Sequence, residues 1–260
     1  MLASRTLLLS PQSLPSSRAA YGIFIRQGVR NPTRIQRVCR NPPVMKGTSG
    51  SETLQNSEEA QLPELVLIGS RRLMQPSPAV EIAQIHTEAF QNRLVTLKQC
   101  MVKYGGIGIA GPQIGWYARV FCFGLFKPSE RYPALNPTTL PFQYWVNPTV
   151  EEAPESRATW FWEGCLSVPD VSGWVGRPDR IVVTGYDENG IKQVMELTGI
   201  AARVFQHEFD HLDGTLFPSR VSNPNYLVPN KAFEDQENWA ENWPTASARQ
   251  TSKGTLSWEE

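Results

Sequence analysis

Two of the three histidines in this chain lie four residues apart, within residues 206–211 (QHEFDH). On an α-helix, side chains at that spacing lie one turn above each other on the same face. His207 and His211 can therefore present both imidazoles to one metal ion, which lowers the pKa of a bound water molecule from about 15.7 towards 7. Glu208 lies beside the pair and can take up a proton and pass it to a leaving amine. The spacing predicts a hydrolytic metal centre rather than two unrelated surface histidines.

A third protein ligand is needed, because catalytic metal sites usually have three protein ligands and one open position. No histidine follows His211. Glu234 or Glu237 would complete the two-His, one-Glu set of a thermolysin-type peptidase. Cys165 is the other candidate, because a glycine before it permits close backbone approach and residues 160–162 (WFW) can form an apolar wall. These residues by themselves leave both alternatives open.

The stretch that carries the histidines also contains apolar residues, which indicates a partly dry site. They are Val204, Phe205 and Leu212. A metal-binding imidazole usually donates its second ring N–H to a nearby acceptor. Asp210 and a backbone carbonyl are the two candidate acceptors, and the sequence does not distinguish them.

Two helices and several short strands are expected around these residues. Apolar residues recur at three- and four-residue spacings over residues 82–101, which predicts a helix with Ser77 as its N-cap and Gly105 at its end. A second helix is predicted over residues 200–212. Stretches rich in β-branched and aromatic residues predict strands at residues 119–125, 142–146, 180–186 and 192–197. Runs of strands with helices at separate points favour an α+β fold over alternating βαβ units.

The two ends of the chain differ in composition from the middle. Residues 1–51 contain seven arginines, one lysine and no acidic residue, which is typical of an organellar transit peptide. We therefore expect residues 1–50 to be a transit peptide, for the mitochondrion on its arginine density or, alternatively, for a plastid. Residues 51–61 are predicted to be a disordered junction and residues 62–222 a catalytic domain. Residues 223–260 are predicted to be an acidic, Trp-containing extension that is weakly ordered.

Charge and hydropathy argue against several classes of partner. The formal net charge of the whole chain is zero, so the part that follows the basic N-terminal segment is acidic overall. An acidic domain is a poor candidate for binding phosphate backbones, and we expect no direct nucleic acid contact. No stretch approaches the ~20 apolar residues that a membrane span needs. The four cysteines lack paired spacing, which argues against a disulfide framework.

Three segments together resemble the signature motifs of the peptide deformylase family, in the family's order. They are residues 106–113 (GIGIAGPQ), residues 163–167 (EGCLS) and the His-Glu-x-x-His run followed by residues 212–214 (LDG). The surroundings of the third motif resemble the mitochondrial and plant organellar branch of the family. One departure is Gly111, where the family commonly has alanine; we expect this small-for-small change to affect the chemistry little.

This resemblance implies an α+β fold with antiparallel sheets around a central helix that carries the His-Glu-x-x-His motif. It also implies that Cys165, His207 and His211 bind the metal and that Glu208 is the general acid and base. The metal would be Fe²⁺, with Zn²⁺, Ni²⁺ and Co²⁺ as alternatives. Zinc suits one cysteine and two histidines and exceeds iron in intrinsic affinity, so the sequence alone does not identify the native ion.

The resemblance further assigns roles to residues that stabilise the reaction or support the site. The Gln113 amide and the backbone N–H of Leu166 would stabilise the oxyanion, and one such donor is worth about 10²–10³ in rate. Glu163 and Arg177 match a pair that supports the site in this family.

The substrate implied by the resemblance is the N-formylmethionyl end of a nascent peptide, and the product is formate. The residues that match the family's methionine pocket are Ile107, Gly108, Phe161, Ile200 and Val204. Apolar walls of this kind suit a flexible thioether. The exit region of an organellar ribosome is a further expected partner.

Two other functions are compatible with parts of the sequence. One is a metalloendopeptidase with Glu234 or Glu237 as third ligand, which leaves Cys165 and the glycine-rich segment unexplained. The other is an inactive relative that binds nascent chains without turnover. Intact candidate ligands and an intact Glu208 argue against the inactive relative.

Overall fold

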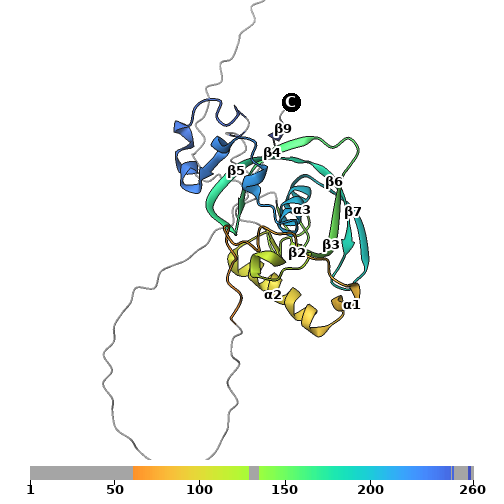
Figure 1. Ribbon diagram of the computed structural model, residues 1–260. Helices are drawn as coiled ribbons and strands as arrows, with labels where there is room; N and C mark the ends of the chain where they lie inside the picture. Colours follow the sequence, from red (N-terminus) through yellow and green to blue (C-terminus); the bar gives the residue numbers. More distant parts are fainter. Residues whose placement is uncertain (1–60, 129–134, 247, 249–256, 259–260) are drawn as a thin grey trace, which may run out of the picture.

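The computed structural model describes residues 61–128, 135–246, 248 and 257–258. The predicted transit peptide, residues 1–50, lies outside the described residues, as does the predicted junction except for residue 61. The described chain forms two antiparallel sheets with helices packed on and between them (Figure 1). This mixture of helices and antiparallel sheets agrees with the predicted α+β class.

The larger sheet has five strands in the order β1-β2-β3-β6-β7. Their bounds are Gly108–Ala110 for β1, Val120–Phe123 for β2, Gln143–Glu152 for β3, Arg180–Tyr186 for β6 and Lys192–Thr198 for β7. All neighbouring strands in this sheet are antiparallel. Strands β6 and β7, both predicted from the sequence, form a hairpin in which the Asp187 N–H donates to the Ile191 carbonyl at 3.0 Å.

The smaller sheet has the strand order β8-β5-β4-β9. Its strands are β4 (Ala158–Cys165), β5 (Val168–Pro178), β8 (Leu227–Pro229) and β9 (Ser257–Trp258). Neither β4 nor β5 is among the strands predicted from the sequence. From residue 161 to its end β4 is buried on both faces, so it has no alternation of apolar and polar residues, and glycines interrupt β5.

The first predicted helix begins later than expected. A short helix, α1 (Ile82–Ile85), precedes the main helix α2 (Glu88–Tyr104). The N-cap of α2 is Thr87, whose hydroxyl accepts from the Phe90 N–H at 3.3 Å, so the prediction of Ser77 as N-cap is wrong. The helix ends as predicted at Gly105, which has a left-handed φ of 71°.

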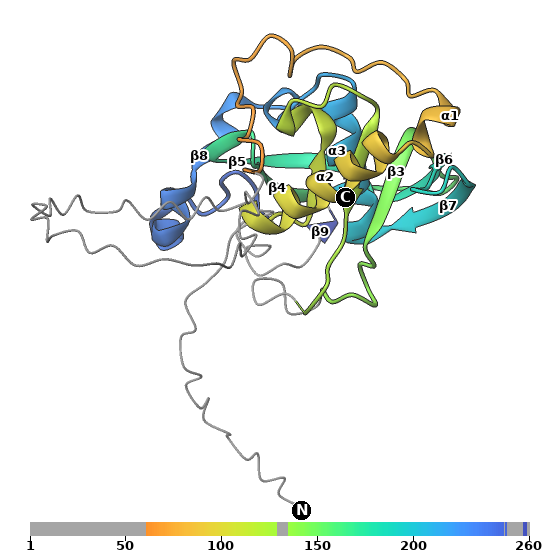
Figure 2. The ribbon, with the colours of Figure 1, turned by 90° about the horizontal axis from the view of Figure 1, so that it is seen from below.

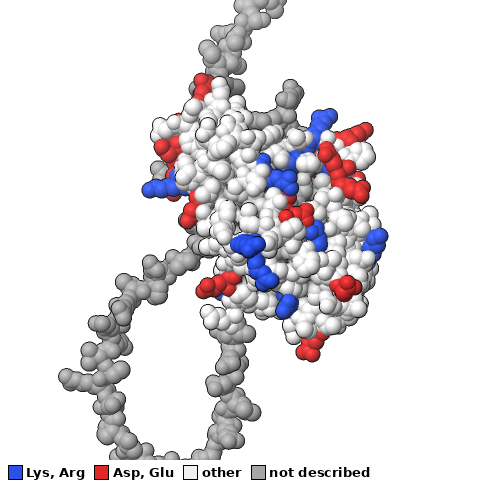
Figure 3. All heavy atoms as spheres, in the orientation of Figure 1, with Lys and Arg blue, Asp and Glu red and all other residues white. Residues whose placement is uncertain are grey.

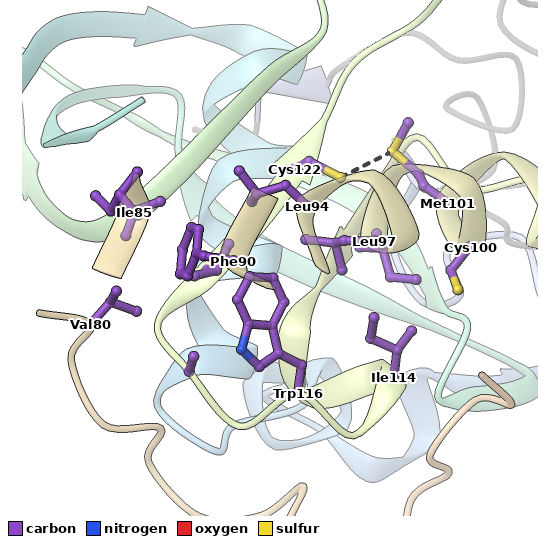
Figure 4. Packing of buried hydrophobic residues seen from close by; sticks show 14 of the residues in the cluster. Val80, Ile85, Phe90, Leu94, Leu97, Cys100, Met101, Ile114, Trp116 and Cys122 are labelled. Carbon is purple, nitrogen blue, oxygen red and sulfur yellow. Dashed lines mark hydrogen bonds between the residues drawn. The ribbon is translucent and has the colours of Figure 1, made fainter. Parts of the chain in front are cut away.

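The apolar face of α2 packs on the η1 turn (Gly111–Ile114) and on the larger sheet (Figure 4). Phe90 contacts the Trp116 ring edge to face, with centroids 5.1 Å apart. Cys122 lies 4.0 Å from the sulfur of Met101, and both side chains are buried. This cluster holds η1, which carries Gln113, against the rest of the domain.

The second helix, α3 (Gly199–Leu212), begins and ends within one residue of the prediction. It contacts strands of both sheets, among them β1 and β2 of the larger sheet and β5 of the smaller one. Figures 1 and 2 show α3 between the smaller sheet and α2, and the segment that leads to α1 running along the outside of the molecule. A helix enclosed in this way can hold polar side chains out of water.

The C-terminal extension differs from its expected weak order over residues 223–246. Two 3₁₀ segments, η3 (Pro224–Tyr226) and η4 (Asn230–Asn238), lie beside the smaller sheet (Figure 1). Phe233 and Trp239 pack on Trp162, with ring centroids 5.0 and 5.7 Å apart. The extension therefore covers one face of β4 and β5.

The surface carries charges of both signs. Lys, Arg, Asp and Glu side chains are interspersed over the face that Figure 3 shows, without a continuous basic stretch. Among the described residues, none of the helices has the length and apolar character needed to cross a membrane.

Candidate metal centre

Both histidines predicted to bind a metal lie on the same face of α3. Their rings are 5.2 Å apart between centroids and meet edge to face. His207 is 5% exposed and His211 1% exposed. The four-residue spacing thus places two buried imidazoles one above the other, as the sequence predicts.

Cys165 reaches these imidazoles from the end of β4. The strand alternates, so that Trp162 faces the C-terminal extension while Glu163 and Cys165 face α3. The register between β4 and β5 shifts after Gly164, and the chain turns back through Leu166 and Ser167. This irregularity places the thiol at the edge of the sheet, next to the helix.

The three predicted ligands converge. One candidate ligand atom from each of Cys165, His207 and His211 lies within 4.8 Å of the others, and the Cys165 Sγ is 3.3 Å from the His211 Nε2. Glu234 and Glu237 are instead exposed on η4. The structure therefore brings the cysteine, and neither downstream glutamate, to the histidines.

Glu163 orients the first imidazole. Its Oε2 lies 3.1 Å from the His207 Nδ1, which leaves the Nε2 of that ring to face the other ligands. Asp210, one of the acceptors considered from the sequence, instead accepts from Arg177 and Arg220 at 2.9 and 2.6 Å. The acceptor is thus the Glu163 carboxylate from β4, for which the sequence predicted only a general supporting role.

Glu163 and Arg177, which were predicted to be a supporting pair, are both buried and bond each other. The Arg177 Nε and Nη2 donate to the two carboxylate oxygens at 2.6 and 2.9 Å. Burial raises the pKa of Glu163, but Arg177, then His207 and Arg203, outweigh burial and hold that pKa well below its ordinary value. Glu163 is therefore an anion, which can only accept hydrogen bonds, so the His207 Nδ1 must be the donor.

Glu208 faces away from this ion pair, towards β1. It is 2% exposed, and burial raises its pKa to about 7. A Cβ added at Gly108 would meet the Glu208 carboxyl group, with the Cδ atom only 2.8 Å away. Gly108, predicted as part of the methionine pocket, thus leaves the space in which this carboxyl group lies.

Gln113 is held in one orientation by its neighbours. Its Oε1 accepts from the Ala110 N–H at 2.7 Å, so the Nε2 must point the other way. There it lies 3.3 Å from the Ser167 Oγ and 3.5 Å from the Cys165 Sγ. Leu166 is in the turn directly after Cys165 and is 1% exposed. Both predicted oxyanion donors therefore lie next to the thiol.

The five residues predicted to line a methionine pocket are only partly grouped. Ile107, Ile200 and Val204 belong to one apolar cluster between α3 and the larger sheet. Phe161 is 1% exposed, and its ring centroid lies 5.8 Å from the guanidinium carbon of Arg203. The structure thus brings three of the five together in one apolar cluster.

Two residues that contact the candidate site, Ser167 and Arg203, were given no role from the sequence. The Ser167 hydroxyl accepts from the Gln113 amide, and the Ser167 backbone N–H donates to the Cys165 sulfur at 3.4 Å. Arg203 is buried and donates to Glu163 at 2.7 Å. A signal for Arg203 was present, because it precedes His207 by four residues and so lies on the ligand face of the helix.

The residues present fit a metal ion. In a tetrahedral site with Zn–S near 2.3 Å and Zn–N near 2.0–2.1 Å, sulfur and nitrogen ligands lie about 3.5 Å apart, close to the 3.3 Å between Cys165 and His211. The buried His207 Nε2 has no hydrogen-bond partner among the described residues. One thiolate and two imidazoles also form a known catalytic ligand set.

Comparison with known proteins points to one family. Residues 62–226 match the family model described as polypeptide deformylase. Peptide deformylase 2 of Pseudomonas syringae pv. tomato is 36% identical over 168 residues, which cover 61% of this chain and 87% of that protein. Peptide deformylase 2 of a Nostoc species is 34% identical over 178 residues, which cover 67% of this chain and 94% of the relative.

Solved structures give the same result. The chain is similar to a Met-Ala-Ser-bound class I type b peptide deformylase from Acinetobacter baumannii, with a TM-score of 0.57 and 29% identity over 62% of this chain and 99% of that one. It is also similar to a peptide deformylase from Thermotoga maritima, with a TM-score of 0.52 and 30% identity over 63% of this chain and 99% of that one. These four relatives are all bacterial.

Proposed function

Because the chain belongs to the polypeptide deformylase family, whose enzymes remove N-formyl groups, we propose that it acts on the N-terminal formylmethionine of newly synthesised organellar proteins and releases formate. The observation that carries the proposal is the convergence of Cys165, His207 and His211 within 4.8 Å, beside a buried Glu208 and the Gln113 amide. Amide hydrolysis needs a group that transfers protons, such as the Glu208 carboxyl, and a donor to the oxyanion, such as the Gln113 amide.

We propose that these three residues hold one divalent ion, with Fe²⁺ as the native metal on family resemblance. Zn²⁺, Ni²⁺ and Co²⁺ suit the same ligands. When bound, a metal supplies Lewis acidity and lowers the pKa of water. The anionic Glu163 supports this role, because it keeps the His207 Nδ1 as a donor and the Nε2 lone pair available.

Glu208 is the proposed proton carrier. Water adds its oxygen to the formyl carbon, and the carbon–nitrogen bond breaks to give formate and a free amine. Glu208 accepts a proton from the attacking water and delivers a proton to the departing nitrogen. Its place one residue after His207, buried against Gly108, supports this assignment because the carboxyl group is confined beside the ligands.

Gln113 and Leu166 are the proposed oxyanion donors. The Gln113 Nε2 carries two hydrogens. Ser167 accepts one of them, and the other faces the Cys165 Sγ 3.5 Å away, on the side of the site where the substrate oxygen would lie. The Leu166 N–H lies in the turn beside Cys165. Fixed donors of this kind stabilise charge as it develops, without reorganising.

Methionine is the proposed first residue of the substrate. Ile107, Ile200 and Val204 form a joint apolar cluster, and Ile107 and Ile200 are only partly buried, so both retain surface for a ligand. An unbranched thioether adapts to such a surface. The formyl group itself needs little room.

The basic, acid-free residues 1–50 are proposed to direct the protein to the mitochondrion, with the plastid as alternative. An organellar ribosome exit region is the proposed place where nascent substrates are met. A fluorescent protein fused behind residues 1–50 should accumulate in mitochondria; a cytosolic distribution contradicts the proposal.

Formate release tests the activity directly. Full-length protein is loaded anaerobically with Fe²⁺, and separately with Co²⁺, and is given formyl-Met-Ala-Ser or acetyl-Met-Ala-Ser. We expect formate from the first peptide only, and loss of activity of the iron form in air. Glu208→Gln should retain metal and lose a factor of about 10²–10⁴ in rate.

The same assay separates the alternatives. Cleavage of internal peptide bonds without formate would indicate an endopeptidase. Binding of the formyl peptide by metal-loaded protein without any formate would indicate an inactive relative, and either result rejects the proposal.

A further inference from the structure

Arg203 is the most deeply buried cation near the metal centre. It lies on α3 one turn before His207 and two turns before His211, and it is 1% exposed. Arginine is almost never fully buried unless it is paired, because removing a charge from water is costly. The hydrogen bonds and ion pair of Arg203 must therefore offset the cost of removing its charge from water.

The guanidinium group joins α3 to both strands of the hairpin that carries Cys165. Its Nη1 donates to the Val175 carbonyl of β5 at 3.0 Å, and its Nη2 donates to the Thr159 carbonyl of β4 at 2.6 Å. These bonds run from the helix that bears the imidazoles to the strands that position the thiol. Arg203 therefore connects the helix of the two imidazoles to both strands beside the thiol.

The Arg203 guanidinium group is also one of the hydrogen-bond partners that surround the Glu163 carboxylate. The Oε1 of that carboxylate accepts from Arg177 and from Arg203 at 2.6 and 2.7 Å. Its Oε2 accepts from Arg177 at 2.9 Å and faces the His207 Nδ1 at 3.1 Å. A carboxylate offers about four lone-pair sites, so the two arginines occupy three and leave one acceptor site, directed at His207.

The pairing of the charged groups shows how Arg203 differs from Arg177. The buried charged residues of this network are Glu163, Arg177, Arg203 and Asp210, and the more exposed Arg220 also bonds Asp210. Arg177 bonds both carboxylates, while Arg203 bonds only Glu163 among the ionised groups. Loss of Arg203 would leave Glu163, beside a candidate ligand histidine, with Arg177 as its one arginine partner, which it shares with Asp210.

We propose that Arg203 is a positioning residue for the metal centre, which fixes Glu163 so that its remaining acceptor site orients His207 and which holds α3 at a set distance from Cys165. This inference rests on the proposed metal-dependent function. It adds a residue outside the catalytic and metal-binding set and assigns it an effect on metal affinity rather than on substrate binding.

Metal affinity of the full-length protein is the readout. Dissociation constants for Zn²⁺ and Co²⁺ are measured by competition with a chelator, and unfolding temperatures are measured for metal-free and metal-loaded protein. Arg203→Met should weaken metal binding by about 10–100-fold, the usual effect of losing a group that orients a ligand. The rise in unfolding temperature on metal addition should shrink accordingly.

Arg119→Met is the matched control. Arg119 also holds α3, through the Leu212 carbonyl at 3.4 Å and Asp213 at 2.7 Å, and it contacts neither Glu163 nor the ligands. It should lower the unfolding temperature of the metal-free protein and leave the metal dissociation constant unchanged. An equal loss of affinity in Arg203→Met and Arg119→Met would reduce Arg203 to a general helix anchor and overturn the proposal.

Arg203→Lys separates geometry from charge and serves if Arg203→Met does not fold. The ammonium group keeps the charge but lacks the planar fork that reaches Glu163 and both carbonyls. We expect weaker metal binding and a changed Co²⁺ absorption spectrum. Wild-type affinity in a folded Arg203→Lys or Arg203→Met variant overturns the proposal, whereas failure of the wild type to bind metal refutes the proposed metal-dependent function instead.

Discussion

At the scale of single residues, hydrogen bonds fix the orientation of two side chains of the site. The Ala110 N–H fixes the Gln113 amide, and Glu163 fixes the His207 ring. Glu208 has no such polar anchor at its Oε2 among the described residues, and it is confined by packing against Gly108 instead. The Glu208 carboxyl group can therefore occupy this position only because Gly108 has no side chain.

Gly108→Ala tests this confinement. The added methyl group would collide with the Glu208 carboxyl group, 2.8 Å from its Cδ atom, so the carboxyl group must move. We expect kcat to fall by a factor of about 10² or more, up to the full contribution of a general acid and base, while metal content stays unchanged. Steady-state kinetics of formate release together with metal analysis measure both quantities.

A Glu208→Gln background is the control for that variant. If Gly108→Ala acts through Glu208, adding it to Glu208→Gln should cause little further loss. Full activity in Gly108→Ala alone would show that the carboxyl group does not depend on this contact.

The candidate ligand residues were predictable because their spacing or their motif is local. His207 and His211 are one helical turn apart, and the resemblance supplied Cys165, Gln113 and Glu163. The partner of His207 was not predictable from spacing, since Glu163 reaches it from a strand 44 residues earlier in the chain. Contacts of that kind depend on how sheet and helix pack.

At the scale of elements, α3 was predicted almost to the residue and α2 was not. Ser77-Pro78 has the composition of a helix start, but the Ser77 N–H donates to the Leu212 carbonyl at 2.8 Å. The segment around Ser77 therefore packs against the C-terminal end of α3 instead of starting a helix. The Ser77 hydroxyl, the group that would cap a helix, has no hydrogen-bond partner among the described residues, and the helix begins at Glu88 after Thr87.

Thr87→Ala tests the observed cap. Loss of the hydroxyl removes the acceptor for the Phe90 N–H and should lower the free energy of unfolding by about 0.5–2 kcal/mol. Denaturant unfolding measures the change, and formate release should remain normal. Ser77→Ala is the comparison and should have the smaller effect; the reverse order would support Ser77 as the cap.

Strands β4 and β5 escaped prediction for a different reason. Strand prediction uses alternation, and β4 is enclosed by α3 on one face and by the C-terminal extension on the other. The sequence WFWEGC therefore reads as an apolar run with one charge. That charge, Glu163, is tolerated because two arginines and an imidazole surround it.

At the scale of the whole molecule, the metal centre depends on parts of the chain that are distant in sequence. The C-terminal extension was expected to be weakly ordered because it is rich in polar residues, yet its aromatic residues pack on Trp162. Trp162 is next to Glu163, with its side chain on the opposite face of β4. The extension therefore covers the outside of the strand whose inside supports the imidazole.

The central claim is that one ion is held by a thiolate from the end of β4 and two imidazoles from α3. Its most direct test is metal content per chain after loading and desalting, for wild type, Cys165→Ser and Glu234→Ala side by side. We predict one ion per chain in the wild type and in Glu234→Ala, and loss of the ion in Cys165→Ser. Retention by Cys165→Ser with loss in Glu234→Ala would contradict the account.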